Sequence, residues 1–428
     1  MPEIGRFVIV KGFIDMLKNQ APRVKPFFNR MLQLAWIITA GALTVLADGF
    51  ESPALAQEQG YSAYHDYQVV TVAEGLERPW SMAFLPGGDM LVTEKPGRLR
   101  VIRDGVLLEE PVSGLPEVYA AGQAGLLDVV PHPDFMSNRL VYLTYSKPQG
   151  GTDSTTAVIR GRFVDDELAD VEEIWVAHSS GRGHYGSRLV FDGQGHIFVT
   201  VGDRQASPSG DLENHPAQDL SNHNGVVVRL NEDGSLPEGN PFSSTEGAEP
   251  DIWSYGHRNA QGMYFDRDTG RLWLTEHGPQ GGDELNLVEP GKNYGWPVIG
   301  YGVNYRSGSA IHESTHKDGM AQPKRIWVPS IATSGLVMYQ GDAFPNWRGH
   351  LLAGGLRGEQ VALLEMSADE VVREETLAQG LGRVRDVRVG PDGLVYLALD
   401  HRDGGTRSIV RLEPVPRAEV QRPVPPGP

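Results

Sequence analysis

The chain has 428 residues, of which 52 are Gly and 30 are Pro, a composition that suits many short strands joined by turns better than long helices. It carries 55 acidic and 38 basic residues, a formal net charge of −17, which argues against nucleic acid as a partner because phosphate binding needs clustered Lys and Arg. It has no Cys, which excludes disulfides, thiolate zinc sites, a Cys nucleophile and a covalent c-type haem.

The N-terminus has the pattern of an export signal. An uncharged apolar run covers residues 31–47, basic residues precede it, and Ala54-Leu55-Ala56 follows as a small-x-small cleavage site. We therefore expect residues 1–56 to be a signal peptide that is cleaved after Ala56. The alternative is an uncleaved anchor, although a run of about 17 residues is at the lower limit for spanning a bilayer. No later segment is apolar enough to cross a membrane, so no stable membrane insertion is expected after cleavage.

Beyond residue 65 one phrase recurs: a short apolar strand, a turn with Pro, Asp, Asn or Gly, and a second apolar strand. Such turn residues supply the positive φ angles that tight hairpins require. The six occurrences span residues 82–94, 129–145, 188–203, 263–278, 338–355 and 387–400. Six similar hairpins with extra strands between them predict an all-β fold, a six-bladed β-propeller over residues 57–412 with about four strands per blade. A pair of sandwiches or a jelly roll with the same hairpins is the alternative.

Long polar loops rich in Gly are expected at residues 203–225, 276–298 and 300–330, and such loops on a rigid β scaffold carry function. Residues 413–428 contain six prolines, which predicts a disordered Pro-rich tail. The sequence has no HExxH, GxSxG or GxxxxGK[ST] motif, so a serine-elbow hydrolase finds no support.

The first candidate site is the phrase GHYGSR at residues 183–188. His184 lies among glycines, where no bulky neighbour shields it from a ligand. An imidazole titrates in the range that suits a general base near neutral pH. The alternative is a loop His bonded to a neighbouring carbonyl.

The second phrase is YGHRNAQG at residues 255–262. It places Arg258 and Asn259 in one turn before a hairpin. The guanidinium could hold a carboxylate or a developing oxyanion, and an inter-blade ion pair is the alternative.

The third phrase is EHGPQGGDE at residues 276–284, followed by NYGWP at residues 293–297. Gly-Pro and Gly-Gly turns expose backbone carbonyls, and the carboxylates of Asp283 and Glu284 follow. Hard oxygen ligands on flexible backbone suit Ca²⁺.

The fourth group is basic. Arg357 follows a predicted strand, and Arg383 and Arg385 lie two residues apart on another, so they share one face. Two unpaired guanidiniums on one face repel each other, and they make sense facing an anion with several carboxylates. The alternative is that both pair with surface Asp or Glu.

Taken together and in order, the phrases RNAQGM, EHGPQGGDELNL, GKNYGWP and GRVRDVRVGPDG resemble the soluble pyrroloquinoline quinone (PQQ)-dependent glucose/sorbosone dehydrogenase family. The resemblance covers roughly residues 68–412 and is closest to the bacterial periplasmic aldose sugar dehydrogenases. It implies a six-bladed propeller in the periplasm with PQQ and Ca²⁺ as cofactors. It also implies a sugar substrate and an external electron acceptor.

The resemblance assigns roles to the polar side chains residue by residue. His184 matches the family's catalytic base, and Gln123 matches its active-site Gln. Arg258 and Asn259 match the pair beside the quinone. The remaining matches are the PQQ carboxylate ligands Arg383 and Arg385.

Two calcium sites are implied in the same way. Gly278 and Pro279 match residues whose carbonyls bind the Ca²⁺ held against PQQ. Glu284 and Tyr294 match positions of a second, structural calcium site. Arg357 stands where the family usually has Lys, and it also supplies a positive charge. Gly183 stands where glucose dehydrogenases have a sugar-binding Asp, so a preference for glucose is not implied.

The implied reaction is oxidation of an aldose at its anomeric carbon to the lactone, with hydride transfer to the quinone. Two other functions share features with it. A Ca²⁺-dependent propeller lactonase or esterase would use the fold, the calcium and the His without needing the arginines. A non-catalytic propeller that binds glycans or proteins in the envelope would need no cofactor.

Overall fold

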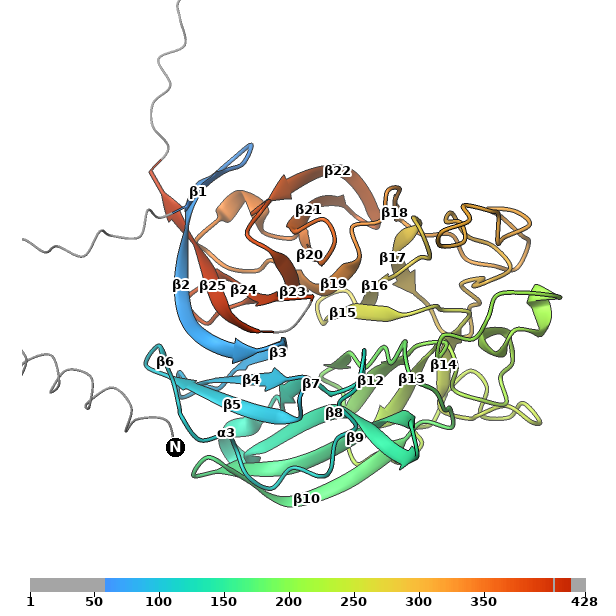
Figure 1. Ribbon diagram of the computed structural model, residues 1–428, viewed down its shortest axis with the longest axis horizontal. Coiled ribbons are helices and arrows are strands. Elements are labelled where there is room, and N and C mark those ends of the chain that lie inside the picture. Colours follow the sequence, from blue (N-terminus) through green and yellow to red (C-terminus); the bar gives the residue numbers. More distant parts are fainter. Residues whose placement is uncertain (1–57, 403–404, 417–428) are drawn as a thin grey trace, which may run out of the picture. The chain divides into compact units, whose positions relative to one another are not determined.

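The computed structural model describes residues 58–402 and 405–416 (Figure 1). The predicted signal peptide over residues 1–56, and residues 417–428 of the predicted tail, lie outside the described residues. Within the described part of the chain no helix is long and apolar enough to cross a membrane. The described residues form six antiparallel sheets arranged as the blades of a β-propeller, so the predicted fold is confirmed.

Five blades are built from consecutive strands, numbered from the innermost outward. The first two are β3 (Pro79–Phe84), β4 (Met90–Glu94), β5 (Arg98–Arg103) and β6 (Val106–Leu107), and then β7 (Leu126–Pro131), β8 (Leu140–Gly150), β9 (Asp153–Val164) and β10 (Glu167–Val176). The third is β11 (Leu189–Phe191), β12 (His196–Val201), β13 (Val226–Asn231) and β14 (Ile252–Tyr255). The fourth and fifth are β15 (Ala260–Asp266), β16 (Arg271–Glu276), β17 (Asp283–Val288) and β18 (Arg325–Trp327), and then β19 (Thr333–Met338), β20 (Leu351–Gly355), β21 (Gln360–Ser367) and β22 (Glu370–Leu377). Short helical turns occur at α3 (Phe135–Asn138), η1 (Leu212–Asn214), η2 (Pro216–Gln218) and η3 (Pro345–Trp347).

The sixth blade joins the two ends of the described chain. Its strands are β23 (Arg383–Val389), β24 (Val395–Asp400), β25 (Thr406–Val415), β2 (Asp66–Glu77) and β1 (Glu58–Tyr61). Strand β2 pairs with β25 along nearly its whole length, so the N-terminal strand completes a blade made of C-terminal strands. Residues 413–415, expected in the tail, pair with residues 66–68 and belong to this blade, because their backbone groups find partners in β2.

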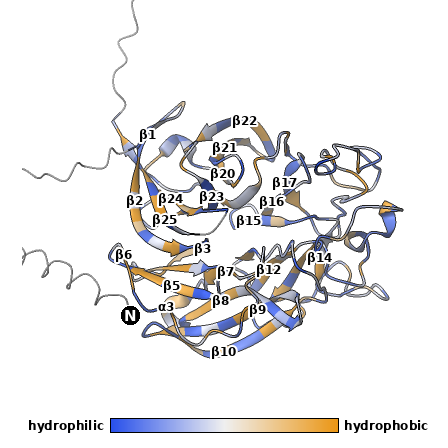
Figure 2. Cartoon of the chain, viewed as in Figure 1, coloured by the Kyte–Doolittle hydropathy of each residue, from blue (hydrophilic) through white to orange (hydrophobic). Residues whose placement is uncertain are grey.

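The innermost strands pack against one another in a closed ring. Strands β3, β7, β11, β15, β19 and β23 each contact the next, and β23 contacts β3. Second strands such as β4, β20 and β24 are buried along their whole length, since both of their faces meet neighbouring blades. Outer strands such as β10 are exposed at several positions, and Figure 2 shows hydrophilic residues along it. The six predicted hairpins correspond to the first two strands of the six blades. The predicted loop at 276–298 contains strand β17.

A buried ion network ties four blades together. The Arg188 guanidinium lies 3.0 Å from Asp128 on β7 and 3.2 Å from Asp386 on β23. Arg388 lies 3.2 Å from the same Asp128 carboxylate and 2.9 Å from Asp386. The Arg188 guanidinium also stacks 4.4 Å from the ring of Trp80 on β3. The network therefore holds the innermost strands in register by directional contacts that apolar packing does not supply.

We expect Arg188→Met to destabilise the protein by about 3–5 kcal/mol, because two buried carboxylates lose a partner in a dry environment. Urea denaturation of the variant and the wild type measures the difference. Arg162→Met is the matched control: Arg162 and Asp170 form an exposed pair, whose loss costs less than about 1 kcal/mol. Equal free energies of unfolding for both variants would contradict a stabilising role for the network.

Candidate functional site

The predicted site residues gather at one end of the blades. In an antiparallel hairpin the start of the first strand and the end of the second lie at the same end, so loops before the first strands and after the second strands meet there. They enclose a cavity of about 220 Å³. Its lining includes the predicted residues Gln123, His184, Arg258, Asn259, Arg383 and Arg385.

A wider cavity of about 440 Å³ adjoins the first. Both are lined by Gln123, His184, Arg258 and Tyr305, so these side chains lie at the junction. The two cavities differ in charge. The smaller one is lined by six cations and one carboxylate: Arg78, Lys95, Arg258, Arg383, Arg385 and Arg402, with Asp400. Most of the further residues of the wider cavity are neutral, among them Gln205, Ser207, Trp296 and Asn304. We call them the cationic cavity and the wide cavity.

His184 is held by a buried carboxylate. Its Nδ1 lies 2.5 Å from Oδ1 of Asp203, which follows strand β12. Asp203 is itself oriented, because its Oδ2 accepts a hydrogen bond of 2.7 Å from the indole of Trp296. The His184 backbone N–H donates to the side chain of Gln123 at 2.8 Å. With Nδ1 engaged by Asp203, Nε2 is the nitrogen left to meet a ligand.

Burial lowers the pKa of His184, and the positive charge of Arg258 lowers it further, while Asp203 opposes both effects. The net pKa is below the ordinary value, so the imidazole is neutral at neutral pH and can accept a proton. The expectation of a loop His bonded to a carbonyl does not hold, because the bond goes to a carboxylate instead.

Glycine at position 183 leaves room beside His184 for another side chain. A Cβ there would lie 2.3 Å from the side-chain amide carbon of Gln205. The side chain of Gln205 therefore occupies the space beside the His that a larger residue 183 would need. It also lines the wide cavity.

Arg258 is held by carbonyls. Its Nη1 donates to the Gly278 carbonyl at 2.7 Å and to the His277 carbonyl at 3.2 Å. Its backbone N–H donates to Glu276 at 2.6 Å. Among the described residues the guanidinium forms no ion pair. The alternative considered from the sequence, an inter-blade ion pair, is therefore absent from this part of the chain. The positive charge of Arg258 stays available to a ligand. Asn259 accepts a hydrogen bond of 3.1 Å from the Gly186 backbone and thus supports the His184 loop.

The two arginines of β23 are not equivalent. Arg385 donates to Gln261 at 2.7 Å and to the buried Asp400 at 3.2 Å, so the expectation of two unpaired guanidiniums is wrong for this residue. Arg383 donates to the Leu356 carbonyl at 3.2 Å. Arg357, the neighbour of Leu356, is exposed and lines neither cavity. The structure therefore does not bring Arg357 together with the residues that line the two cavities, and its contact with a cofactor stays a prediction.

Several site residues were missed in the sequence. Asp203 lies two residues after the second strand of one blade, Asp400 ends the second strand of another, and Lys95 follows a third such strand. A charged residue at the end of a mostly apolar second strand is the signal that could have found them. His277 was inside a phrase that was singled out, although no role was given to it. Its burial lowers its pKa to about 3, so it lines the cavity as a neutral ring.

The residues predicted to hold metal ions lie around a small cavity of about 20 Å³, enough for one water-sized particle. Gly278, Pro279, Glu284 and Tyr294 all line it. Burial and the negative charge of the nearby Glu276 raise the pKa of Glu284 to about 8. The side-chain amide of Asn286 donates to both carboxylates, and its hydrogen bond opposes this shift. The Tyr294 hydroxyl is engaged, donating to the Leu287 carbonyl at 2.6 Å and accepting from the Glu289 N–H at 2.9 Å.

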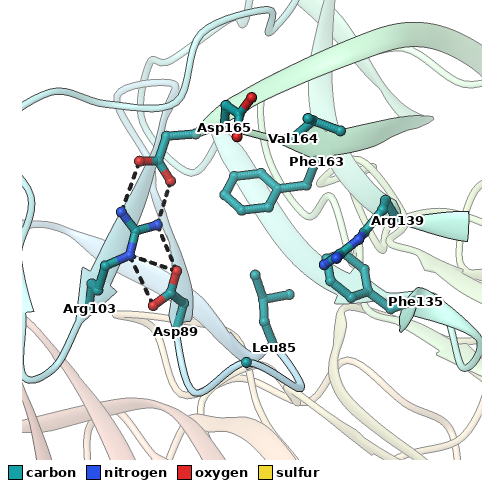
Figure 3. Close-up of a pocket in the computed structure, with 10 residues that line it drawn as sticks. Leu85, Asp89, Arg103, Phe135, Arg139, Phe163, Val164 and Asp165 are labelled. Carbon is teal, nitrogen blue, oxygen red and sulfur yellow. Dashed lines mark hydrogen bonds and ion pairs between the residues drawn. The ribbon is translucent and has the colours of Figure 1, made fainter. Parts of the chain in front are cut away.

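A fourth cavity, of about 510 Å³, lies at the opposite ends of the strands, where the β3–β4 and β9–β10 turns approach α3 (Figure 3). Figure 3 shows Arg103 across from the rings of Phe135 and Phe163. Arg103 binds Asp89 at 2.7 Å and Asp166 at 2.8 Å, so its charge is neutralised within the protein. None of the predicted site residues lines this cavity.

Comparison with known proteins identifies the family. The family model of glucose/sorbosone dehydrogenases matches residues 76–411. The aldose sugar dehydrogenase YliI of Escherichia coli K12 is 41% identical over 345 residues, which cover 78% of this chain and 91% of that protein. The crystal structure of the soluble aldose sugar dehydrogenase of E. coli in its apo form has a TM-score of 0.75 at 38% identity, covering 82% of this chain and 100% of that one. The PQQ-bound aldose sugar dehydrogenase of Streptomyces coelicolor has a TM-score of 0.66 at 27% identity, covering 81% and 98%.

The structure thus combines a six-bladed propeller with a buried His–Asp pair beside a cationic cavity. The chain belongs to the glucose/sorbosone dehydrogenase family and is an oxidoreductase.

Proposed function

We propose that this protein oxidises aldose sugars at the anomeric carbon to the lactone, with PQQ and Ca²⁺ as cofactors. The observation that carries the proposal is the position of the His184–Asp203 pair, at the junction of the cationic cavity and the wide cavity. A sugar in the wide cavity and an anionic cofactor in the cationic cavity would both touch His184. The names of the E. coli and Streptomyces relatives support the same substrate class and cofactor.

The residues of the cationic cavity fit a tricarboxylate. Six basic side chains line the cavity with one carboxylate, and that carboxylate is already bonded to Arg385. Buried nitrogens of two lining residues, Arg258 Nε and Arg385 Nε, have no hydrogen-bond partner within residues 58–402 and 405–416. Buried donors without partners are costly, and carboxylate oxygens of a bound anion would satisfy them. Arg383 and Arg385 would hold the carboxylates, with Arg258 and Asn259 beside the ring system.

Bound PQQ would supply the hydride acceptor. His184 would then act on the sugar through Nε2, taking the proton of the anomeric hydroxyl as hydride leaves the same carbon. Asp203 would stabilise the imidazolium that forms and keep the ring oriented, and Gln123 would fix the backbone of His184. Arg258 would hold a fixed positive charge at the junction, where negative charge develops.

The carbonyls of Gly278 and Pro279 are suited to Ca²⁺, which prefers oxygen ligands. The Gly278 carbonyl already accepts a hydrogen bond from Arg258, so one lone pair remains for a cation. Glu284 is the acidic candidate for a second ion in the small cavity. Since the hydroxyl of Tyr294 is engaged, that residue would contribute its backbone carbonyl. Export to the periplasm is also proposed, on the N-terminal sequence pattern.

The test combines purified protein with PQQ and Ca²⁺, separately and together, in the presence of aldoses and a dye that accepts electrons. We expect dye reduction, and a change in the absorbance of PQQ, only when both cofactors are added. The absence of both activity and PQQ binding would overturn the proposal. Hydrolysis of lactones with Ca²⁺ alone would then support the hydrolase alternative, and glycan binding without turnover would support the binding propeller.

A further inference from the structure

Lys95 is a buried amine that the proposed reaction does not use. It follows strand β4, it is 5% exposed, and it lines the cationic cavity. Its Nζ donates to the Gly122 carbonyl at 3.0 Å, and Arg78 donates to the same carbonyl at 3.1 Å. Among the described residues Lys95 forms no ion pair. An amine on a flexible stem is therefore held at the wall of the cavity by one neutral acceptor.

The charges around this amine are mostly of its own sign. Arg78 approaches from the β2–β3 junction, and Arg383 and Arg385 approach from β23. Asp400, at the end of β24, is the opposing charge, and it is bonded to Arg385. Burial lowers the pKa of Lys95 to about 7, and the charges of Arg385 and Arg78 contribute to the shift. At about pH 8 the amine of the empty cavity is thus mostly neutral.

We propose that Lys95 is a further binding residue for the anionic cofactor, and that filling the cavity brings one proton onto its amine. The inference rests on the proposed function, because it needs a polycarboxylate in the cationic cavity. A carboxylate near the amine favours the ammonium form, and it also screens the neighbouring guanidiniums. The proton comes from solvent, so the step is amine plus proton giving ammonium, with no change in oxidation state. Loading of the enzyme is then coupled to pH.

The test is calorimetric titration of PQQ into the Ca²⁺-supplemented protein, at about pH 8 and about pH 5.5, in buffers of different ionisation enthalpy. The dependence of the binding heat on the buffer counts the protons taken up. We expect an uptake of most of one proton at about pH 8 and much less at about pH 5.5, where the amine is already largely charged.

Two variants separate Lys95 from the histidines His184, His277 and His401, which line the same cavity. Lys95→Arg keeps the positive charge at every pH, so PQQ should bind with almost no proton uptake. Lys95→Met should lose the uptake and weaken PQQ binding about 10- to 100-fold at the lower pH, as expected for one hydrogen bond to a charged group. Lys147→Met, which removes a surface amine paired with Glu173, is the control and should leave both quantities unchanged.

The outcomes distinguish the two proposals. A wild-type protein that does not bind PQQ would overturn the cofactor assignment, and the role of Lys95 with it. Tight PQQ binding without proton uptake at about pH 8, or uptake that persists in Lys95→Arg, would overturn only the role of Lys95. The wild-type comparison at two pH values needs no variant to fold.

Discussion

Replacing His184 by Ala is expected to lower kcat about 10²–10⁴-fold while PQQ remains bound. The loss is this large because the imidazole is the group that takes the proton, and water cannot replace a base held at fixed geometry. PQQ should remain bound because the basic side chains of the cationic cavity are unchanged in this variant. Steady-state turnover with a dye acceptor gives kcat, and the absorbance of protein-bound PQQ gives the occupancy.

His196→Ala is the matched control for this variant. His196 also binds an aspartate through Nδ1, at 2.7 Å from Asp192, but it lines neither cavity of the site. It should keep kcat within about twofold, as expected for a residue outside the chemistry. Wild-type kcat in His184→Ala would falsify the assignment of the base.

Asp203→Asn tests the carboxylate behind the base. Because Asp203 raises the pKa of His184 against the effect of burial, its neutralisation should lower that pKa further. The base works only when neutral, so activity is lost as pH falls through its pKa. The acid limb of kcat/KM should therefore move to lower pH, while kcat falls because the ring is less well oriented. A lower kcat with an unmoved acid limb would indicate a structural role only.

The second large effect is expected from Arg383 and Arg385. Replacing both by Gln should raise the Kd for PQQ by about 10²–10⁴-fold, since each removes a charge-assisted hydrogen bond worth about 1.5–3 kcal/mol. Equilibrium titration with PQQ in the presence of Ca²⁺ measures the change. Arg411→Gln serves as the control, because Arg411 lies in the same blade and pairs with Glu413 outside the cavity.

The single variant Arg383→Gln separates binding from folding. Removing Arg385 leaves Asp400 buried without its partner and is expected to destabilise the blade, whereas Arg383→Gln keeps that pair intact. Weaker PQQ binding with an unchanged melting temperature in Arg383→Gln would support direct contact with the cofactor. Unchanged affinity in both variants would remove the arginines from the cofactor site.

The blades could be predicted from the sequence because their determinants are local. In each hairpin, alternating apolar residues and a turn with positive φ act within about fifteen residues, so neither depends on the rest of the chain. The phrase around His184 and the basic pair on β23 were visible for the same reason. By contrast, the closure of the sixth blade by β2 joins residues more than 300 positions apart, and no local pattern specifies that pairing.

Which charges meet was decided by the tertiary structure. Asp203 lies 19 residues from His184 and in a different loop, and Trp296 reaches the same carboxylate from the next blade. Lys95 and Arg385 come from the first and the last blades of the chain, and they face one cavity because the ring closes between β23 and β3. Sequence by itself therefore determined the strands, the turns and the residue types available for chemistry. Only the tertiary structure decided their partners, their burial and hence their pKa values, because electrostatic interactions depend on distance in space and on exclusion of water.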